Sequence, residues 1–387
     1  MYYCGIDIAK AGHVASLVDE TGAVVKQGVV ISNDQNGFEQ LDQWLLPYQG
    51  HVRIGLEATG HYWLALYEHL VQQGFELTVI NPLQVKAFRK MDIRKRKTDR
   101  LDSVAISEYL RFATPNSTQA PLPVILQLKE LTRFRFHLVQ QIGDCKRKII
   151  SILDRVFPEY EQLFTDVFLV SSRQLLSHAV TADEFAAFDL AELEQLLQSV
   201  SHKRFGLEKA RQIHAAASQS VGVSFLSDAI HIEMHCMLQQ IEFLEAQCEQ
   251  VEIKIEELMI SIPHHVTTIP GVGLVTGAMF LAEIGDIQRF PSIEKLVAYA
   301  GIDASVYKTG QFEGNEMHMS KRGSHYLRCA LYQAATASLM HNPELKQYYD
   351  KKRAEGKPHG VAMGALCRKL LGRIYIVMKE QRAYEMR

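Results

Sequence analysis

Carboxylates inside apolar, strand-like runs near the N-terminus limit the folds that this chain can adopt. Asp7 lies in YYCGIDIAK, and Glu57 lies at the end of the apolar part of VRIGLEATG. An acidic side chain on a hydrophobic strand is costly unless a cation neutralises it. Asp99 and Asp102 follow in KTDRLDSVAISEYL, three residues apart and therefore on one face of a predicted helix. The four carboxylates predict a site for a divalent metal ion.

The order of the N-terminal elements favours a ribonuclease-H-like α/β fold. Apolar runs and turn signals predict three strands, a helix, a strand, a helix and a fifth strand, in the order MYYCGIDIAK, HVASLVDE, AVVKQGVVIS, GFEQLDQWLLPY, VRIGLEAT, HYWLALYEHLVQQG and FELTVINP. In that fold, acidic residues project from the first and fourth strands, which lie adjacent at the centre of the sheet. Asp7 and Glu57 fall on these two strands.

Two long helices are predicted in the middle of the chain. Apolar residues recur every three or four positions over residues 124–157, and a cleaner heptad runs over residues 230–262. The two rows fit an antiparallel hairpin within the chain, and they fit equally a coiled-coil contact between subunits. The segment 160–228 predicts shorter helices, with Thr181 and Glu184 as a capping box.

These changes of pattern predict three domains. We expect an α/β nuclease-like domain over residues 1–120, a helical coiled-coil region over 121–262 and a mainly helical domain over 263–387. The last domain opens with IPGVG, a glycine turn before a small-residue-rich helix. This is the signal of a helix-hairpin-helix, whose backbone N–H groups can bind a phosphate.

Positive charge is clustered, although the net charge of the chain is only −2. The run VKAFRKMDIRKRKTDR leads directly into Asp99, and a second cluster is MSKRGSHYLR. Local basic patches on a neutral chain favour a polyanion partner, and the position beside the acidic residues favours nucleic acid. We expect the first run to follow a phosphate backbone of RNA or DNA through Arg94, Lys95, Arg96 and Lys97.

Cysteine usage and hydropathy exclude other classes of protein. The six cysteines are scattered without a C-x-x-C pair, so a zinc site is disfavoured. No apolar run approaches the length of a membrane-spanning helix, and the first residues lack the pattern of a secretory signal. We therefore expect a cytoplasmic protein with no membrane partner.

Motifs along nearly the whole chain resemble the DEDD-type insertion-sequence transposases, the family of bridge-RNA-guided serine recombinases. In order they are GIDIAK, GLEATGHYW, INPLQVKAFRK, KTDRLDSVAI, IPGVG, LVAYAGID and YKTGQFEGNEMHMSKRGSHYLRCALY. The resemblance implies a RuvC-like N-terminal domain and a C-terminal transposase domain. It also implies that the family's acidic tetrad, which binds Mg²⁺ or Mn²⁺, corresponds to Asp7, Glu57, Asp99 and Asp102.

The resemblance also implies a nucleophile, and here the chain departs from the family. The family's serine stands in a Ser-Gly pair after an AGID-like strand, and the matching residue is Thr309 in YKTGQF. Threonine keeps the hydroxyl, but its methyl group crowds the approach to phosphorus and restricts χ1. The departure fits a natural variant, a weakened enzyme or a deliberate substitution. Ser305 and Ser320 are fallback nucleophiles outside the matching position.

The implied function is RNA-guided cleavage and exchange of DNA strands through a covalent protein–DNA intermediate. The implied partners are target and donor DNA, a structured non-coding guide RNA and further copies of the chain, as a dimer or tetramer. Thr309 follows the carboxylates by some two hundred residues, so the site is expected to be composite. Three basic residues are expected to hold DNA beside it: Lys321, Arg322 and Arg328.

Three other functions compete with this interpretation. A RuvC-like endonuclease would cut branched DNA with metal-activated water and would need the carboxylates but not Thr309. An actin-like ATPase is disfavoured because the glycine-rich adenosine motifs are missing. A non-catalytic nucleic-acid-binding scaffold would need neither the metal nor the hydroxyl.

Overall fold

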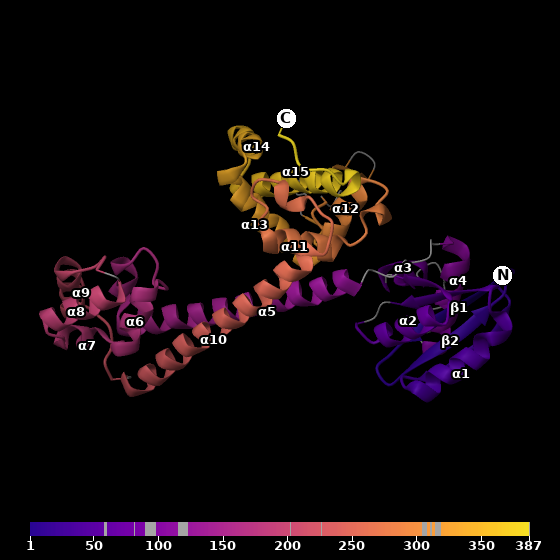
Figure 1. Ribbon diagram of the computed structural model, residues 1–387, viewed down its shortest axis with the longest axis horizontal. Coiled ribbons are helices and arrows are strands. Elements are labelled where there is room, and N and C mark those ends of the chain that lie inside the picture. Colours follow the sequence, from indigo (N-terminus) through magenta and orange to yellow (C-terminus); the bar gives the residue numbers. More distant parts are fainter. Residues whose placement is uncertain are drawn as a thin grey trace. The chain divides into compact units, whose positions relative to one another are not determined.

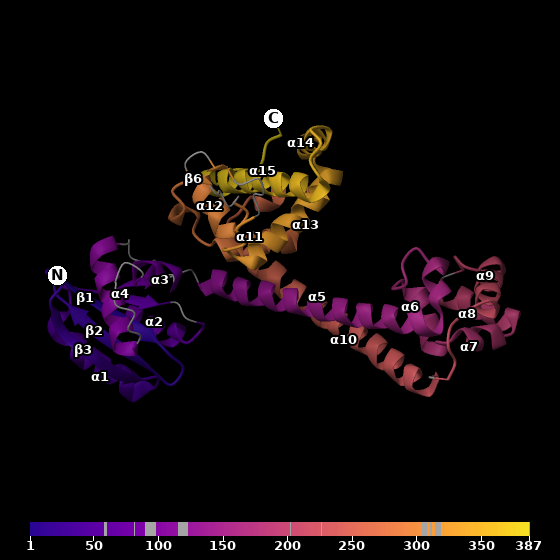
Figure 2. The same ribbon diagram turned by 180° about the vertical axis from the view of Figure 1, so that it is seen from behind.

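The computed structural model contains two compact units, Met1–Ala120 and Pro121–Arg387 (Figure 1, and from behind in Figure 2). Each unit has its own arrangement of elements. The residues that the structure describes are 1–57, 60–80, 82–89, 98–114, 123–201, 203–225, 227–303, 308–309, 312–313 and 319–386.

The first unit is built on a five-stranded mixed sheet. Its elements are β1 (Tyr2–Ile8), β2 (Gly12–Val18), β3 (Val24–Ser32), α1 (Gln35–Leu45), β4 (Val52–Glu57), α2 (Trp63–Gln72), β5 (Glu76–Ile80), α3 (Pro82–Arg89) and α4 (Asp99–Ala113). The strand order is β3-β2-β1-β4-β5, in which β1 pairs antiparallel with β2 and parallel with β4. The predicted order of elements is confirmed, and β1 and β4 are adjacent at the centre.

The two faces of this sheet carry different side chains because successive residues of a strand point to opposite sides. Cys4, Ile6 and Ile8 belong to a core that includes buried residues of α1 and α2. A Cβ atom built on Gly5 would instead meet α4, which covers the opposite face. Asp7 is two residues further along β1 and therefore shares the α4 face with Gly5.

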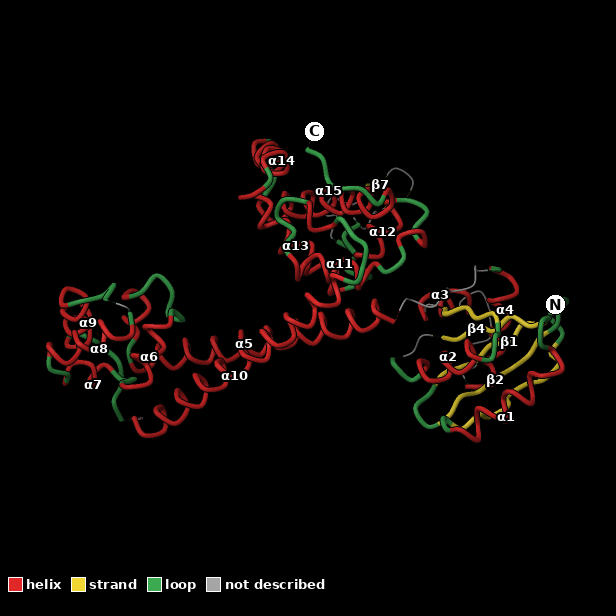
Figure 3. The backbone as a smooth tube through the Cα atoms, viewed as in Figure 1, coloured by secondary structure: helices red, strands yellow, loops and turns green. Residues whose placement is uncertain are grey.

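The second unit is helical and contains a long hairpin, formed by α5 (Pro123–Val156) and α10 (Ser227–Ile260) (Figure 3). Arg135 pairs with Glu252, and further along α5 Lys148 pairs with Glu233. As the residue number increases along α5, the number of its partner on α10 decreases, so the two helices are antiparallel. The hairpin within the chain is confirmed, while a coiled coil between subunits stays a prediction.

The remaining elements of this unit form two groups. Four helices follow α5 and precede α10 along the chain: α6 (Val170–His178), α7 (Ala182–Ala187), α8 (Leu190–Val200) and α9 (Leu207–Ser218). After them come α11 (Leu274–Ile284), α12 (Ile293–Ala300), β6 (Lys308–Thr309), β7 (Phe312–Glu313), α13 (His325–His341), α14 (Pro343–Ala354) and α15 (His359–Glu380). Among the helices described, none is both long and apolar enough to span a membrane. The expected domain division after residue 262 stays a prediction.

Candidate functional site

A glycine in β1 lets α4 approach the sheet at backbone distance. A Cβ atom on Gly5 would lie 2.3 Å from the nitrogen of Ser107 and 2.4 Å from the carbonyl oxygen of Ser103. The two serines are one helical turn apart, and both are fully buried. Ser103 Oγ also lies 2.7 Å from Ser16 Oγ on β2. Small residues on the helix and the sheet therefore fix where α4 lies.

This packing gathers the four predicted carboxylates at one end of the sheet. Ile6 of β1 pairs with Leu56 of the parallel strand β4. Asp7 and Glu57 are the next residues on these two adjacent strands. The first turn of α4 supplies Asp99 and Asp102. Burial raises the pKa of Asp7 to about 6, and the charges of the other three carboxylates act in the same direction.

The beginning of α4 explains how its two acids are placed. Thr98 caps the helix, because its side chain accepts a hydrogen bond from the nitrogen of Leu101. Asp99 is exposed, whereas Asp102 is 7% exposed. Carboxylates in a first turn are favoured by the helix dipole, so Asp99 would be acceptable there without any ligand. Asp102 is the buried acid of the pair and needs a partner.

The partner of Asp102 is an arginine at the end of α3. Arg89 Nη1 lies 2.8 Å from Asp102 Oδ1. The charge of Arg89 also lowers the pKa of Asp7, but burial and the carboxylates outweigh it. Arg89 lies within the basic run noted in the sequence, yet its contact with Asp102 was not predicted.

The chemistry of this cluster fits a hard divalent cation. Carboxylate oxygens are the ligands that Mg²⁺ and Mn²⁺ prefer. Burial first, and then repulsion from the other three acids, raises the pKa of Asp7, so a cation there would be favourable. Within the described residues, however, no three His, Cys, Asp or Glu side chains are arranged as a ligand group. The donors and their charge therefore fit a metal ion, and the side chains must converge further to hold one.

Thr309 belongs to the second unit, in a short antiparallel ladder. It ends β6 and pairs with Phe312 of β7. The side chain of Thr309 lies outside the described part, as do Ser305 and the basic residues Arg94, Lys95, Arg96 and Lys97. The roles predicted for these residues stay predictions.

The two chain segments that flank Thr309 are bonded to each other. The nitrogen of Ser320 donates to the carbonyl oxygen of Asp303 at 3.0 Å, and its hydroxyl also donates to the Asp303 carboxylate. Gly301, with a φ of 68°, accepts a 3.0 Å hydrogen bond from the nitrogen of Lys321. The Ser320 hydroxyl therefore has a structural partner. The bonded residues 301–303 and 320–321 form a fixed base, at which the segment that carries Thr309 starts and ends.

The basic residues predicted beside Thr309 have different surroundings. Lys321 and Arg322 are exposed at this base. Arg328 Nη1 instead donates a 3.0 Å hydrogen bond to the carbonyl oxygen of Ala300, at the end of α12. The first two are available to a phosphate, while Arg328 has a structural contact that the sequence did not indicate.

A buried glutamate links α5 to the same base. Glu283 of α11 receives two hydrogen bonds from Arg133, and Ser324 Oγ donates to the same carboxylate at 2.8 Å. Ser324 is also the N-cap of α13. Burial opposes ionisation of Glu283, but the hydrogen bond from Arg133 and the charges of Lys129 and Arg133 lower its pKa. Glu283 therefore fixes the start of α13 to the long helix.

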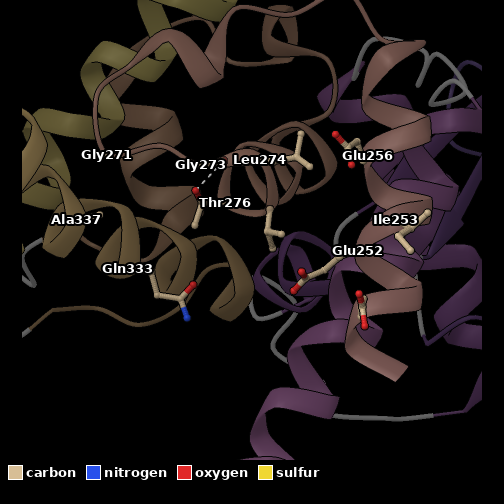
Figure 4. Close-up of a pocket in the computed structure, with 11 residues that line it drawn as sticks. Glu252, Ile253, Glu256, Gly271, Gly273, Leu274, Thr276, Gln333 and Ala337 are labelled. Atoms are coloured by element: carbon tan, nitrogen blue, oxygen red, sulfur yellow. Dashed lines mark hydrogen bonds between the residues drawn. The ribbon is translucent and has the colours of Figure 1, made fainter. Parts of the chain in front are cut away.

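The glycine turn predicted to bind phosphate opens into an acidic groove of about 590 Å³ (Figure 4). Gly271, Gly273 and Thr276 line one side, and Glu252 and Glu256 of α10 line the other. Glu256 brings negative charge to the side opposite the turn, whereas the charge of Glu252 is offset by its ion pair with Arg135. The phosphate-binding role expected from IPGVG stays a prediction.

Two family models match the chain. A model described as "Transposase", of the DEDD type, matches residues 4–158, and a model described as "Transposase IS116/IS110/IS902 family" matches residues 264–350. The first match contains all four carboxylates and Arg89, and the second contains Thr309 and the base that holds its segment.

Individual proteins from bacteria are similar to the chain over almost its full length. An uncharacterised 42 kDa protein of insertion element IS900 from Mycobacterium paratuberculosis is 25% identical, over 99% of this chain and 96% of its own. A pilin gene-inverting protein from Moraxella bovis is 22% identical, over 100% and 98%. The transposase for insertion sequence element IS1111A from Coxiella burnetii is 24% identical, over 90% and 80%.

Proposed function

Because this chain belongs to the IS110 family of DEDD-type transposases, we propose that it cleaves and exchanges DNA strands through a covalent bond to Thr309. In this proposal the first unit is a ribonuclease-H-like, RuvC-like domain in which Asp7, Glu57, Asp99 and Asp102 hold Mg²⁺ or Mn²⁺. A structured RNA selects target and donor DNA. The single observation that supports the catalytic site best is geometric: Asp7 and Glu57 end adjacent parallel strands, and the first turn of α4, which packs on that sheet, carries Asp99 and Asp102.

The bound cation would supply charge neutralisation for a phosphoryl transfer. The chain's own residues supply the nucleophile and hold the nucleic acid. The hydroxyl of Thr309 loses its proton and its oxygen forms a bond to phosphorus, while the bond from phosphorus to the neighbouring nucleotide oxygen breaks and that oxygen takes up a proton. Because the new linkage is also a phosphodiester, a hydroxyl of a second strand can lose its proton and attack the same phosphorus, which releases Thr309 and restores its hydroxyl. Lys321 and Arg322 hold the phosphate backbone beside Thr309, and the basic run from Arg94 to Lys97 holds RNA or DNA.

This mechanism requires the carboxylates and Thr309 to meet, within one chain or between subunits of a dimer or tetramer. The fixed base supports this requirement, because its hydrogen bonds hold both ends of the segment that carries Thr309 at one place on the second unit. The antiparallel hairpin of α5 and α10 is the element through which two copies would associate in this proposal.

The proposal is tested by trapping the covalent intermediate. The protein, purified with its RNA, is incubated with DNA and analysed under denaturing conditions for a protein–DNA adduct, whose attachment site is mapped. We expect an adduct at Thr309 that is lost in Thr309→Ala and in Asp7→Asn. Thr309→Ser is the matched control and should form the adduct at least as fast, because it keeps the hydroxyl and removes the methyl group.

Two other outcomes would replace the proposal. Cleavage by Thr309→Ala without any adduct would identify a metal-dependent endonuclease that uses water. Calorimetric binding of Mn²⁺ that is equal in the wild type and in Asp7→Asn would remove the metal site and leave a nucleic-acid-binding scaffold.

A further inference from the structure

Arg89 occupies the position of a cation at the most buried acid of the cluster. Its Nη1 lies 2.8 Å from Asp102 Oδ1, and the side chain of Asp102 is only 10% exposed. A carboxylate so far from water requires a positive partner. In the described part of the chain, the guanidinium of Arg89 is that partner.

The remainder of the guanidinium is poorly satisfied. Arg89 Nε and Nη2 are buried and have no acceptor among the described residues. A buried donor without an acceptor destabilises the arrangement that contains it. Charge attraction to Asp102, rather than a complete set of hydrogen bonds, therefore holds Arg89 in place.

One guanidinium does not neutralise the cluster. Arg89 carries one positive charge and contacts Asp102, whereas four carboxylates stand on β1, β4 and the first turn of α4. A divalent cation carries twice the charge and accepts several carboxylate oxygens at once, so it suits the same position better than Arg89 does. Because Arg89 contacts Asp102 Oδ1, a metal ion that uses this oxygen must displace it.

We infer that Arg89 is an internal counter-ion, which occupies Asp102 in the metal-free protein and competes with a divalent cation for it. Arg89 therefore sets the concentration of metal at which the carboxylates become loaded. This inference rests on the proposed function, because it requires Asp7 and its neighbours to bind metal.

Calorimetric titration of the full chain with Mn²⁺ tests this competition. Arg89→Met removes the guanidinium and should bind Mn²⁺ about tenfold more tightly, the change expected on removing one nearby charge at a partly exposed site. Lys86→Met is the matched control: Lys86 is also on α3 and is exposed, so its removal should change the affinity by much less. Arg89→Lys keeps the charge with fewer donors and should lie between the wild type and Arg89→Met.

Each result decides the question. Equal affinities for Arg89→Met and the wild type, or equal gains in Arg89→Met and Lys86→Met, would overturn the inference. If circular dichroism shows that Arg89→Met does not fold, the neutral and polar Arg89→Gln replaces it, and a wild-type affinity of that variant would again overturn the inference. Failure of the metal site itself is separate, because the wild type would then bind Mn²⁺ no better than Asp7→Asn.

Discussion

The backbone nitrogen of Gly5 donates a 2.8 Å hydrogen bond to Ser107 Oγ, across 102 positions of sequence. The contact joins the backbone of the central strand to a short serine side chain on α4. It places the first turn of α4, with Asp102, at the end of the strand where the charge of Asp102 acts on Asp7. The position of the acidic cluster therefore depends on a residue that has no functional group.

Gly5→Ala should separate α4 from the sheet. The new methyl group would lie within 2.4 Å of α4 backbone atoms, which cannot rotate away as a side chain can. We expect a loss of stability of about 1–3 kcal/mol and weaker Mn²⁺ binding. Thermal unfolding and calorimetry measure the two effects. Gly372→Ala in α15 is the control, since its methyl group meets no atom within 4 Å, and an equal loss there would contradict this explanation.

Asp7→Asn should raise the melting temperature of the metal-free protein. Burial and three carboxylates disfavour the ionised form of Asp7, and the amide removes that penalty. Differential scanning fluorimetry in chelator gives the shift. Asp19→Asn is the control for charge removal in the same unit, because hydrogen bonds from Thr21 and the nearby backbone lower the pKa of Asp19. A higher melting temperature in both variants would point to net charge instead.

Glu283→Gln should destabilise the second unit. The amide cannot satisfy Arg133 as a carboxylate does, and the buried position admits little water. Arg133 is 36% exposed, so we expect a loss of about 2–3 kcal/mol, less than for a fully buried pair. Denaturant unfolding measures it. Glu257→Gln removes an exposed partner of Lys254 on α10 and should leave the midpoint unchanged.

The same glutamate should make stability depend on acid pH. The pKa of Glu283 is lower in the folded protein than its ordinary 4.5, so the unfolded chain binds more protons as the pH falls. Its contribution is complete above pH 4.5 and is lost as the pH falls through the folded value. The stability difference between the wild type and Glu283→Gln should therefore narrow below pH 4.5. A constant difference would show that Glu283 does not titrate in this range.

Neutralising Arg94, Lys95, Arg96 and Lys97 together should weaken nucleic-acid binding and flatten its salt dependence. Each phosphate that the variant no longer neutralises should reduce the steepness of log K against log salt by roughly one unit. Binding titrations of RNA and DNA across a salt series measure the slope. An unchanged slope would remove these residues from the interface.

The sequence predicted helices, strands and caps well, because these depend on residues close to one another in the chain. The order of strands and helices along the N-terminal part of the chain followed from apolar runs and turns, and the Thr181–Glu184 capping box is present as predicted. The contact between Arg89 and Asp102 depends on how α3 and α4 pack, which no spacing encodes. A weak signal for α4 packing did exist, since Gly5 precedes Asp7 and Gly55 precedes Glu57 by two residues, on the same face of each strand.

The acidic groove beside the glycine turn was missed for a similar reason. IPGVG has the local pattern of a phosphate-binding turn, but Glu252 and Glu256 come from α10 and reach the turn only in the folded chain. Local pattern identified the turn correctly. Only tertiary structure supplied the charge around it.

The bonds between Asp303 and Ser320, and between Gly301 and Lys321, have a consequence for changes in the segment between them. Both ends of the intervening segment are anchored by the scaffold itself, mostly through backbone groups that every residue has. A change at position 309, or a longer segment, would remove none of these bonds. We therefore expect such a change to leave the helices on either side in place.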